Sequence, residues 1–112
     1  MRTELVTEPG DRNRPNEDFA SVALPAPGLG GALVVLDGVT PPKGDDGCVH
    51  GVPWFATRLG GTLTELSLSL PDVTLTEVLA RAIRRTADAH ADTCDQHARQ
   101  EVGHIAAGRF DA

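Results

Sequence analysis

The apolar positions of the N-terminal half follow the pattern of two strands joined by a turn. Residues 19–24 alternate weakly between apolar and polar, and the unbroken apolar run of residues 32–36 ends at Asp37 and Gly38. A run of this kind, bounded by glycines, is typical of a strand that is buried on both faces. Because a short segment rich in proline and glycine separates the two runs, we expect them to form an antiparallel hairpin.

The hydrophobic period changes to that of a helix after residue 51. Residues 52–70 carry apolar side chains at helical spacing, and the proline in the first turn is tolerated there. A second helix is expected after a break at residues 71–73, because Thr74 and Glu77 match a capping box, in which each side chain bonds to the backbone of the other residue. Its apolar stripe consists of Leu75, Val78, Leu79, Ala82, Ile83 and Ala87. The same spacing continues through Ala91, Cys94, Ala98, Val102 and Ile105, and Gly103 is an earlier point at which the helix can stop.

Two glycines, Gly60 and Gly61, interrupt the first predicted helix. Each lowers helix stability by roughly 1 kcal/mol relative to alanine, and close packing against a neighbouring element is a physical reason to keep them. Because the linker between the helices is short, the two helices are expected to pack as an antiparallel pair. The sequence therefore predicts an α+β fold, with an antiparallel β-hairpin or sheet packed on an antiparallel pair of α-helices.

Composition and charge narrow the classes of partner. The 112 residues carry a formal net charge of −6, which argues against binding nucleic acid through lysine and arginine contacts to phosphates. No apolar run approaches the length of a membrane span, and the N-terminus has no apolar core of signal-peptide length. The two cysteines are too few for the disulfide framework of a small secreted domain. We therefore expect a cytoplasmic protein with no nucleic-acid partner and no membrane partner.

Two acidic motifs fall at one end of the predicted hairpin. Asn16-Glu17-Asp18 stands at the entrance to the first strand, and Asp37-Gly38 stands at the exit from the second. Antiparallel pairing puts these ends side by side, so that the two aspartates face one small volume. Two carboxylates that close repel each other unless a proton or a cation lies between them. Their oxygen ligands suit Mg²⁺ or Mn²⁺.

The order of these motifs resembles the start of the metal-dependent protein phosphatase 2C (PPM-type) family. The shared features are an Asn-Glu-Asp triplet that opens a strand, a later apolar strand that ends in Asp-Gly, a glycine-rich loop and two long helices. The resemblance covers the N-terminal part of that family's domain and implies part of its αββα sandwich. It assigns residues 1–94 to this domain and leaves residues 95–112 as a divergent helical or disordered tail.

The resemblance implies a role for each residue of the two motifs. Asp18 and Asp37 are implied to be direct metal ligands, and the carbonyl oxygen of Gly38 is implied to be a third. Glu17 is implied to act through metal-bound water. These residues would serve a pair of Mn²⁺ or Mg²⁺ ions, which activate a water and offset charge on the phosphoryl oxygens.

The arginine that orients the phosphate in this family is assigned by position. It commonly stands four residues before the glutamate, where this chain has Asn13. Arg12 and Arg14 flank that position, and we favour Arg14 as the catalytic arginine. The loop after Gly38 also departs from the family pattern, because it continues with Val-Thr-Pro-Pro in place of a Gly-Gly pair.

The activity implied by the resemblance is hydrolysis of phosphoserine or phosphothreonine in a phosphoprotein substrate. The family takes its remaining metal-binding aspartates from later strands, and its domain is much longer than this chain. After residue 70, no Asp-Gly or Asp-Asn pair follows an apolar strand. We therefore interpret the chain as a truncated serine/threonine phosphatase with a partial metal site, inactive alone. A frameshift or an early stop is one explanation of the tail.

Two other interpretations stay open. A non-catalytic interaction protein would bind a protein partner, or a second copy of itself, through its helix pair, the exposed side of the hairpin and the open edge of its sheet. His90, Cys94 and His97 are also spaced by single helical turns, with His104 further on, and such spacing allows Zn²⁺ binding. A solvated helix face is the simpler interpretation of these residues.

Overall fold

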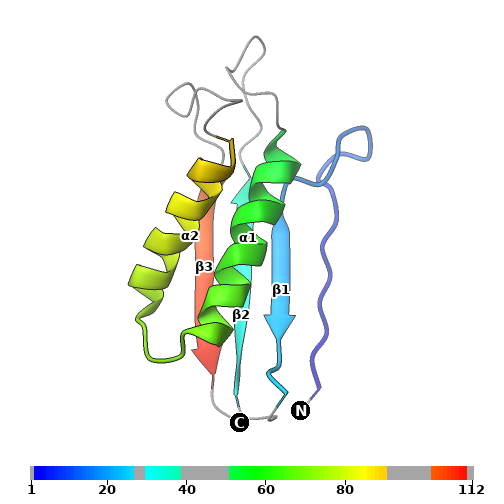
Figure 1. The fold of residues 1–112 in the computed structure, drawn as a ribbon. Coiled ribbons are helices and arrows are strands. Elements are labelled where there is room, and N and C mark those ends of the chain that lie inside the picture. Colours follow the sequence, from blue (N-terminus) through cyan, green and yellow to red (C-terminus); the bar gives the residue numbers. More distant parts are fainter. Residues whose placement is uncertain (1, 27–29, 39–50, 91–101, 111–112) are drawn as a thin grey trace.

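Two helices cover one face of a three-stranded antiparallel sheet (Figure 1). The computed structural model describes residues 2–26, 30–38, 51–90 and 102–110. In chain order, the elements are β1 (Phe19–Ala23), β2 (Gly31–Gly38), α1 (Val52–Ser69), α2 (Leu75–His90) and β3 (Val102–Phe110). The strand order β1-β2-β3 makes β2 the central strand, and the predicted α+β fold is confirmed. Within the described residues, no helix is long and apolar enough to cross a membrane.

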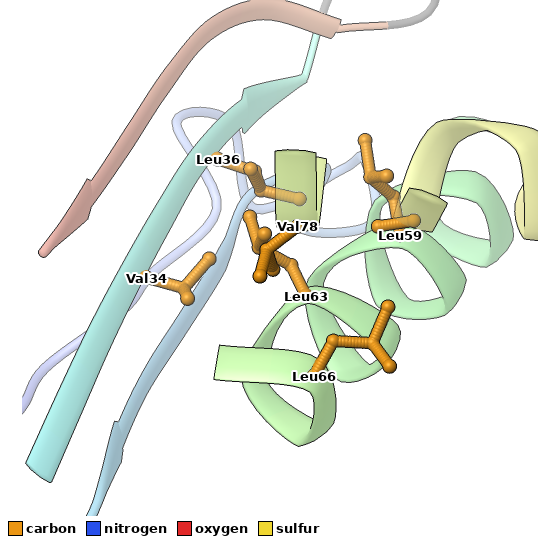
Figure 2. Close-up of a cluster of buried hydrophobic side chains, with 7 residues drawn as sticks. Val34, Leu36, Leu59, Leu63, Leu66 and Val78 are labelled. Carbon is orange, nitrogen blue, oxygen red and sulfur yellow. The ribbon is translucent and has the colours of Figure 1, made fainter. Parts of the chain in front are cut away.

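One face of β2 lines the hydrophobic core. Ala32, Val34 and Leu36 are buried on this face. Figure 2 shows the helix side chains that pack in the same core, among them Leu59, Leu63, Leu66 and Val78. The alternate residues Leu33 and Val35 point to the other face and remain 41% and 48% exposed. The expectation that this strand is buried on both faces is therefore wrong, because the described helices cover only one side of the sheet.

Gly60 of α1 leaves room for the aromatic ring of Phe19 in β1 to pack against the helix backbone. A Cβ atom on Gly60 would lie 2.2 Å from Cδ1 of this ring, so that a side chain there would push the helix away from the sheet. Close packing against a neighbour, the predicted reason for this glycine, is confirmed. The same prediction is wrong for Gly61, because a Cβ atom there would meet nothing within 4 Å.

The start of α2 follows half of the predicted capping box. Thr74 Oγ1 accepts a hydrogen bond from the backbone N–H of Glu77 at 3.2 Å, which satisfies one of the free donors of the first turn. The carboxylate of Glu77, however, pairs with Arg81 at 3.1 Å and Arg84 at 3.5 Å. These contacts, the hydrogen bond from Arg81 above all, lower the pKa of Glu77. The cap therefore stabilises the helix through Thr74, while Glu77 joins an exposed charge cluster.

The third strand corrects the expectation for the C-terminal segment. β3 pairs with β2 in antiparallel register over the length of both strands. The expected continuation of the second helix through Val102 and Ile105 is therefore wrong, as is the description of residues 102–110 as a helical or disordered tail. The spacing of these residues fits a helix only by coincidence, and pairing with β2 satisfies their backbone groups instead. Residues 95–101 and the proposed boundary at residue 94 lie outside the described residues.

Arg109 of β3 joins the sheet to the end of α1 and the turn that follows it. Its guanidinium donates hydrogen bonds to the backbone carbonyl oxygens of Ser67, Leu70 and Val73, at 3.1, 2.8 and 2.6 Å. Carbonyls at a helix C-terminus have no partner within the helix, and a cation there also interacts favourably with the helix dipole. One half-buried side chain thus connects segments that are far apart in the sequence.

We expect Gly60→Ala to lower the free energy of unfolding by roughly 1–3 kcal/mol, because the new methyl group overlaps the Phe19 ring. Gly61→Ala is the matched control. It should raise the free energy of unfolding by about 1 kcal/mol, since alanine favours the helix and the space is open. Urea denaturation followed by circular dichroism measures both. Equal effects of the two substitutions would contradict the proposed packing of Phe19.

Arg109→Ala should lower the free energy of unfolding by about 2–3 kcal/mol, because three carbonyl oxygens lose a charged donor. Arg58→Ala, on the exposed side of α1, should change it by less than about 0.5 kcal/mol. The same denaturation measurement applies. A loss for Arg109→Ala no larger than that for Arg58→Ala would show that the three bonds do not hold β3.

Candidate metal centre

The ends of β1 and β2 meet at a small acidic hollow. Their register pairs Phe19 with Leu36, which places Asp18 beside Asp37 at the same end of the hairpin. Both aspartates line a hollow of about 280 Å³. Its other lining residues are Gly10, Asp11, Arg14, Pro15, Asn16, Glu17 and Gly38. The structure therefore brings all five residues of the predicted site to one place.

Three hydrogen bonds fix the entrance to β1. The side-chain oxygen of Asn16 accepts a hydrogen bond from the backbone N–H of Asp18 at 3.0 Å, and its amide nitrogen lies 2.7 Å from Thr7 Oγ1. Asp18 Oδ1 accepts the backbone N–H of Gly38 at 3.1 Å. Asp18 is thus oriented from two sides. Sequence reasoning assigned no role to Asn16 or Thr7, although asparagine is a known signal for a turn closed by a side chain–backbone hydrogen bond.

Gly38 allows the two strand ends to approach each other closely. A Cβ atom at this position would lie 2.1 Å from the carbonyl oxygen of Glu17 and 2.9 Å from Cγ1 of Val52. The pairing of β2 with β3 also shifts its register between Asp37 and Gly38. Any side chain here would separate the carbonyl of Glu17 from β2, and the N–H donated to Asp18 would move with it.

A turn around Asp11 brings Arg14 to the rim of the hollow. The side chain of Asp11 accepts the backbone N–H of Asn13 at 2.9 Å, and its carbonyl oxygen accepts that of Arg14 at 3.0 Å. Arg14 lines the hollow and Arg12 does not. This placement agrees with the preference for Arg14, and its role toward a phosphate stays a prediction.

The donor set fits one hydrated cation but not the pair of metals that the resemblance implies. Mg²⁺ is commonly held by one or two carboxylates while it keeps several waters, and Asp18 and Asp37 provide that number. Within the described residues, no three side chains of the histidine, cysteine, aspartate and glutamate types converge on one point. Glu17 lines the hollow without completing such a group.

The residues of the possible zinc site do not share one helix. His90 is the last residue of α2, and His104 lies in β3. Cys94 and His97 lie outside the described residues. The prediction that His104 continues the helical series of ligands is therefore wrong, and the other three positions stay untested.

No family model matches this chain, and comparisons with curated proteins and with solved structures give no match either.

Gly38→Ala should lower the free energy of unfolding by about 2 kcal/mol or more, because its methyl group overlaps the backbone of Glu17. Gly10→Ala, on the rim of the same hollow, is the matched control, since a Cβ atom there meets nothing within 4 Å. We expect it to change stability by less than about 0.5 kcal/mol. Thermal and urea unfolding measure both variants. If Gly38→Ala is as stable as Gly10→Ala, the strand ends do not approach as described.

Proposed function

We propose that this chain carries a partial metal site of the kind found in metal-dependent PPM-type protein phosphatases, and that it binds one divalent cation at the hairpin end. One observation carries this proposal. Asp18 and Asp37, separated in the sequence, line the same small hollow with Arg14 and Gly38. The resemblance of the two motifs to that family adds to it, and the expected substrate class is a phosphoserine or phosphothreonine side chain.

Each residue of the hollow has a separate part in this proposal. Asp18 and Asp37 would hold Mn²⁺ or Mg²⁺ through carboxylate oxygens, which these hard cations prefer. Arg14 would bind and orient a phosphate, because a guanidinium matches phosphate oxygens in both charge and geometry. When bound, the cation would supply charge stabilisation and lower the pKa of a coordinated water.

Turnover is not expected from this chain alone. Two-metal hydrolysis needs more ligands than the described residues bring to the hollow. A single, weakly held cation would leave the reaction without the second metal ion that stabilises the transition state. The same reasoning assigns the described residues a share in a phosphatase site and not the complete site. We also propose a cytoplasmic location, because two cysteines in 112 residues suit a reducing compartment.

We expect the purified chain to bind Mn²⁺ with a dissociation constant on the order of 10⁻³ M, as weak oxygen-ligand sites do. Asp37→Asn should weaken this binding about tenfold, because it removes one of two charged ligands. Asp88→Asn, on the exposed side of α2, is the control and should leave it unchanged. Electron paramagnetic resonance of free Mn²⁺ gives the constants. Equal constants for wild type and Asp37→Asn would contradict the proposal.

The activity itself needs a separate assay. With a phosphoserine peptide and excess Mn²⁺, we expect no turnover above the buffer rate. Turnover that Asp37→Asn abolishes would mean that the site is more complete than proposed. Turnover that this substitution leaves intact would place any activity elsewhere.

A non-catalytic interaction protein is the second candidate. The observation that favours it is the exposure of Leu33 and Val35 on the side of the sheet that the helices leave open. Exposed apolar side chains on neighbouring positions of a strand are a common sign of a contact surface. This surface lies on the side of the hairpin away from the helices, and the sequence proposed the exposed side of the hairpin as a partner surface together with the helix pair and the sheet edge.

A further inference from the structure

A series of hydrogen bonds leads from the N-terminal segment to the acidic hollow. Residues 4–8 border β1 and β2 beside the two aspartates, and Figure 1 shows this segment running alongside β1. Within it, Thr7 Oγ1 accepts a hydrogen bond from the amide nitrogen of Asn16 at 2.7 Å. The amide oxygen of Asn16 accepts the backbone N–H of Asp18 at 3.0 Å, and Asp18 Oδ1 accepts that of Gly38 at 3.1 Å. Asn16 therefore links the N-terminal segment to a proposed metal ligand.

The two bonds of the Asn16 side chain hold its amide group in one orientation. The backbone N–H of Asp18 can only donate, so it requires the oxygen side of the amide. The nitrogen then points the other way and needs an acceptor, which Thr7 Oγ1 provides. A flipped amide would bring two donors together and open the turn that precedes β1. Thr7 therefore supports the turn through Asn16.

This turn orients the Asp18 carboxylate before any cation arrives. Asn16 holds the backbone of Asp18, and the N–H of Gly38 holds its Oδ1. Among the described residues, no donor occupies the second carboxylate oxygen, so Asp18 can offer that oxygen to a cation without losing a bond. A ligand that is fixed in advance loses less conformational freedom on binding, and outer partners that fix a ligand raise metal affinity.

We infer that Asn16 and Thr7 act together as positioning residues for Asp18, an inference that rests on the proposed cation site. Thr7 does not line the hollow, so it acts through Asn16. Asn16 acts through Asp18, because its side-chain oxygen already accepts the N–H of that residue. All three bonds lie at the surface. The effect of each on cation affinity should therefore be about three- to tenfold, the lower end for partners that orient a ligand.

Electron paramagnetic resonance of free Mn²⁺ with the full chain tests the two residues. Asn16→Ala and Thr7→Val should each raise the dissociation constant for Mn²⁺ about three- to tenfold. Thr7→Ser keeps the hydroxyl group and should bind as wild type does. Asn13→Ala and Thr3→Val are the matched controls, because among the described residues neither side chain makes a hydrogen bond. Both controls should leave the constant unchanged.

The double variant tests whether the two residues act as a unit. If Thr7 acts through Asn16, the chain with both Thr7→Val and Asn16→Ala should bind Mn²⁺ as weakly as Asn16→Ala alone. Effects of the two substitutions that multiply would contradict the inference, because Thr7 would then act by a separate route.

Amide exchange gives a readout that a purely structural role would not change. Whatever the Asn16 bond contributes to cation binding, the cation must contribute to that bond. Saturating Mg²⁺ should therefore slow solvent exchange of the Asp18 amide proton about three- to tenfold, as measured by NMR, and Asn16→Ala should abolish this slowing. The N–H of Glu77, which bonds to Thr74 Oγ1 at the start of α2, is the control and should exchange at an unchanged rate. An Asp18 amide that Mg²⁺ does not slow would overturn the inference.

The outcomes separate this inference from the proposed function. A wild-type chain that binds no Mn²⁺ contradicts the proposed site and the positioning role with it. Binding that Asp37→Asn weakens, but that Asn16→Ala and Thr7→Val leave unchanged, overturns the positioning role alone. Circular dichroism checks that each variant is folded. Thr7→Val lies outside the helices and the sheet, so it decides the question even if Asn16→Ala fails to fold.

Discussion

The antiparallel register of β1 against β2 determines where the two proposed metal ligands, Asp18 and Asp37, lie. Because Phe19 pairs with Leu36, the Phe19 ring packs against Gly60 of α1, and Asp18 lies beside Asp37. A slip of one residue would turn the ring out of the core and send one aspartate to a different part of the surface. The hydrophobic contact and the acidic hollow are thus two results of one pairing. Packing of an aromatic ring helps to hold two like charges together.

The C-terminal strand gives the sheet its two unlike faces. Arg109 anchors β3 to the end of α1, which turns Ile105 and Ala107 toward the helices, where they border a small hollow with Leu63. Because alternate residues point to opposite faces, Ala106 and Gly108 point away from the helices, where they pair with the exposed residues Val35 and Leu33 of β2. The anchoring of β3 therefore decides which of its residues face the helices and which lie on the other side of the sheet.

The sequence predicted the structure well where the apolar pattern of a segment fitted only one kind of element. The hairpin ends, marked by Asp18 and Asp37, the first helix and the start of the second helix follow from apolar periods and turn residues, and the structure places them as expected. β3 was missed because Val102 and Ile105 fit a helical stripe, while alanines and glycine give no strand alternation. Burial of β2 on both faces was overestimated because an apolar run shows that a face can be covered, not that it is. The support of Asp18 by Asn16 depends on spatial neighbours that periodicity does not reveal.

Paramagnetic broadening of amide NMR signals by trace Mn²⁺ tests most directly whether the two aspartates share one cation. Broadening falls steeply with distance from the ion, so it locates the site without assuming an activity. We expect the signals of Asp18, Asp37 and Gly38 to broaden first, while those of Ala23 and Ala32 at the other end of the hairpin stay sharp. Broadening spread evenly over the acidic surface, or centred on α2, would contradict a shared site.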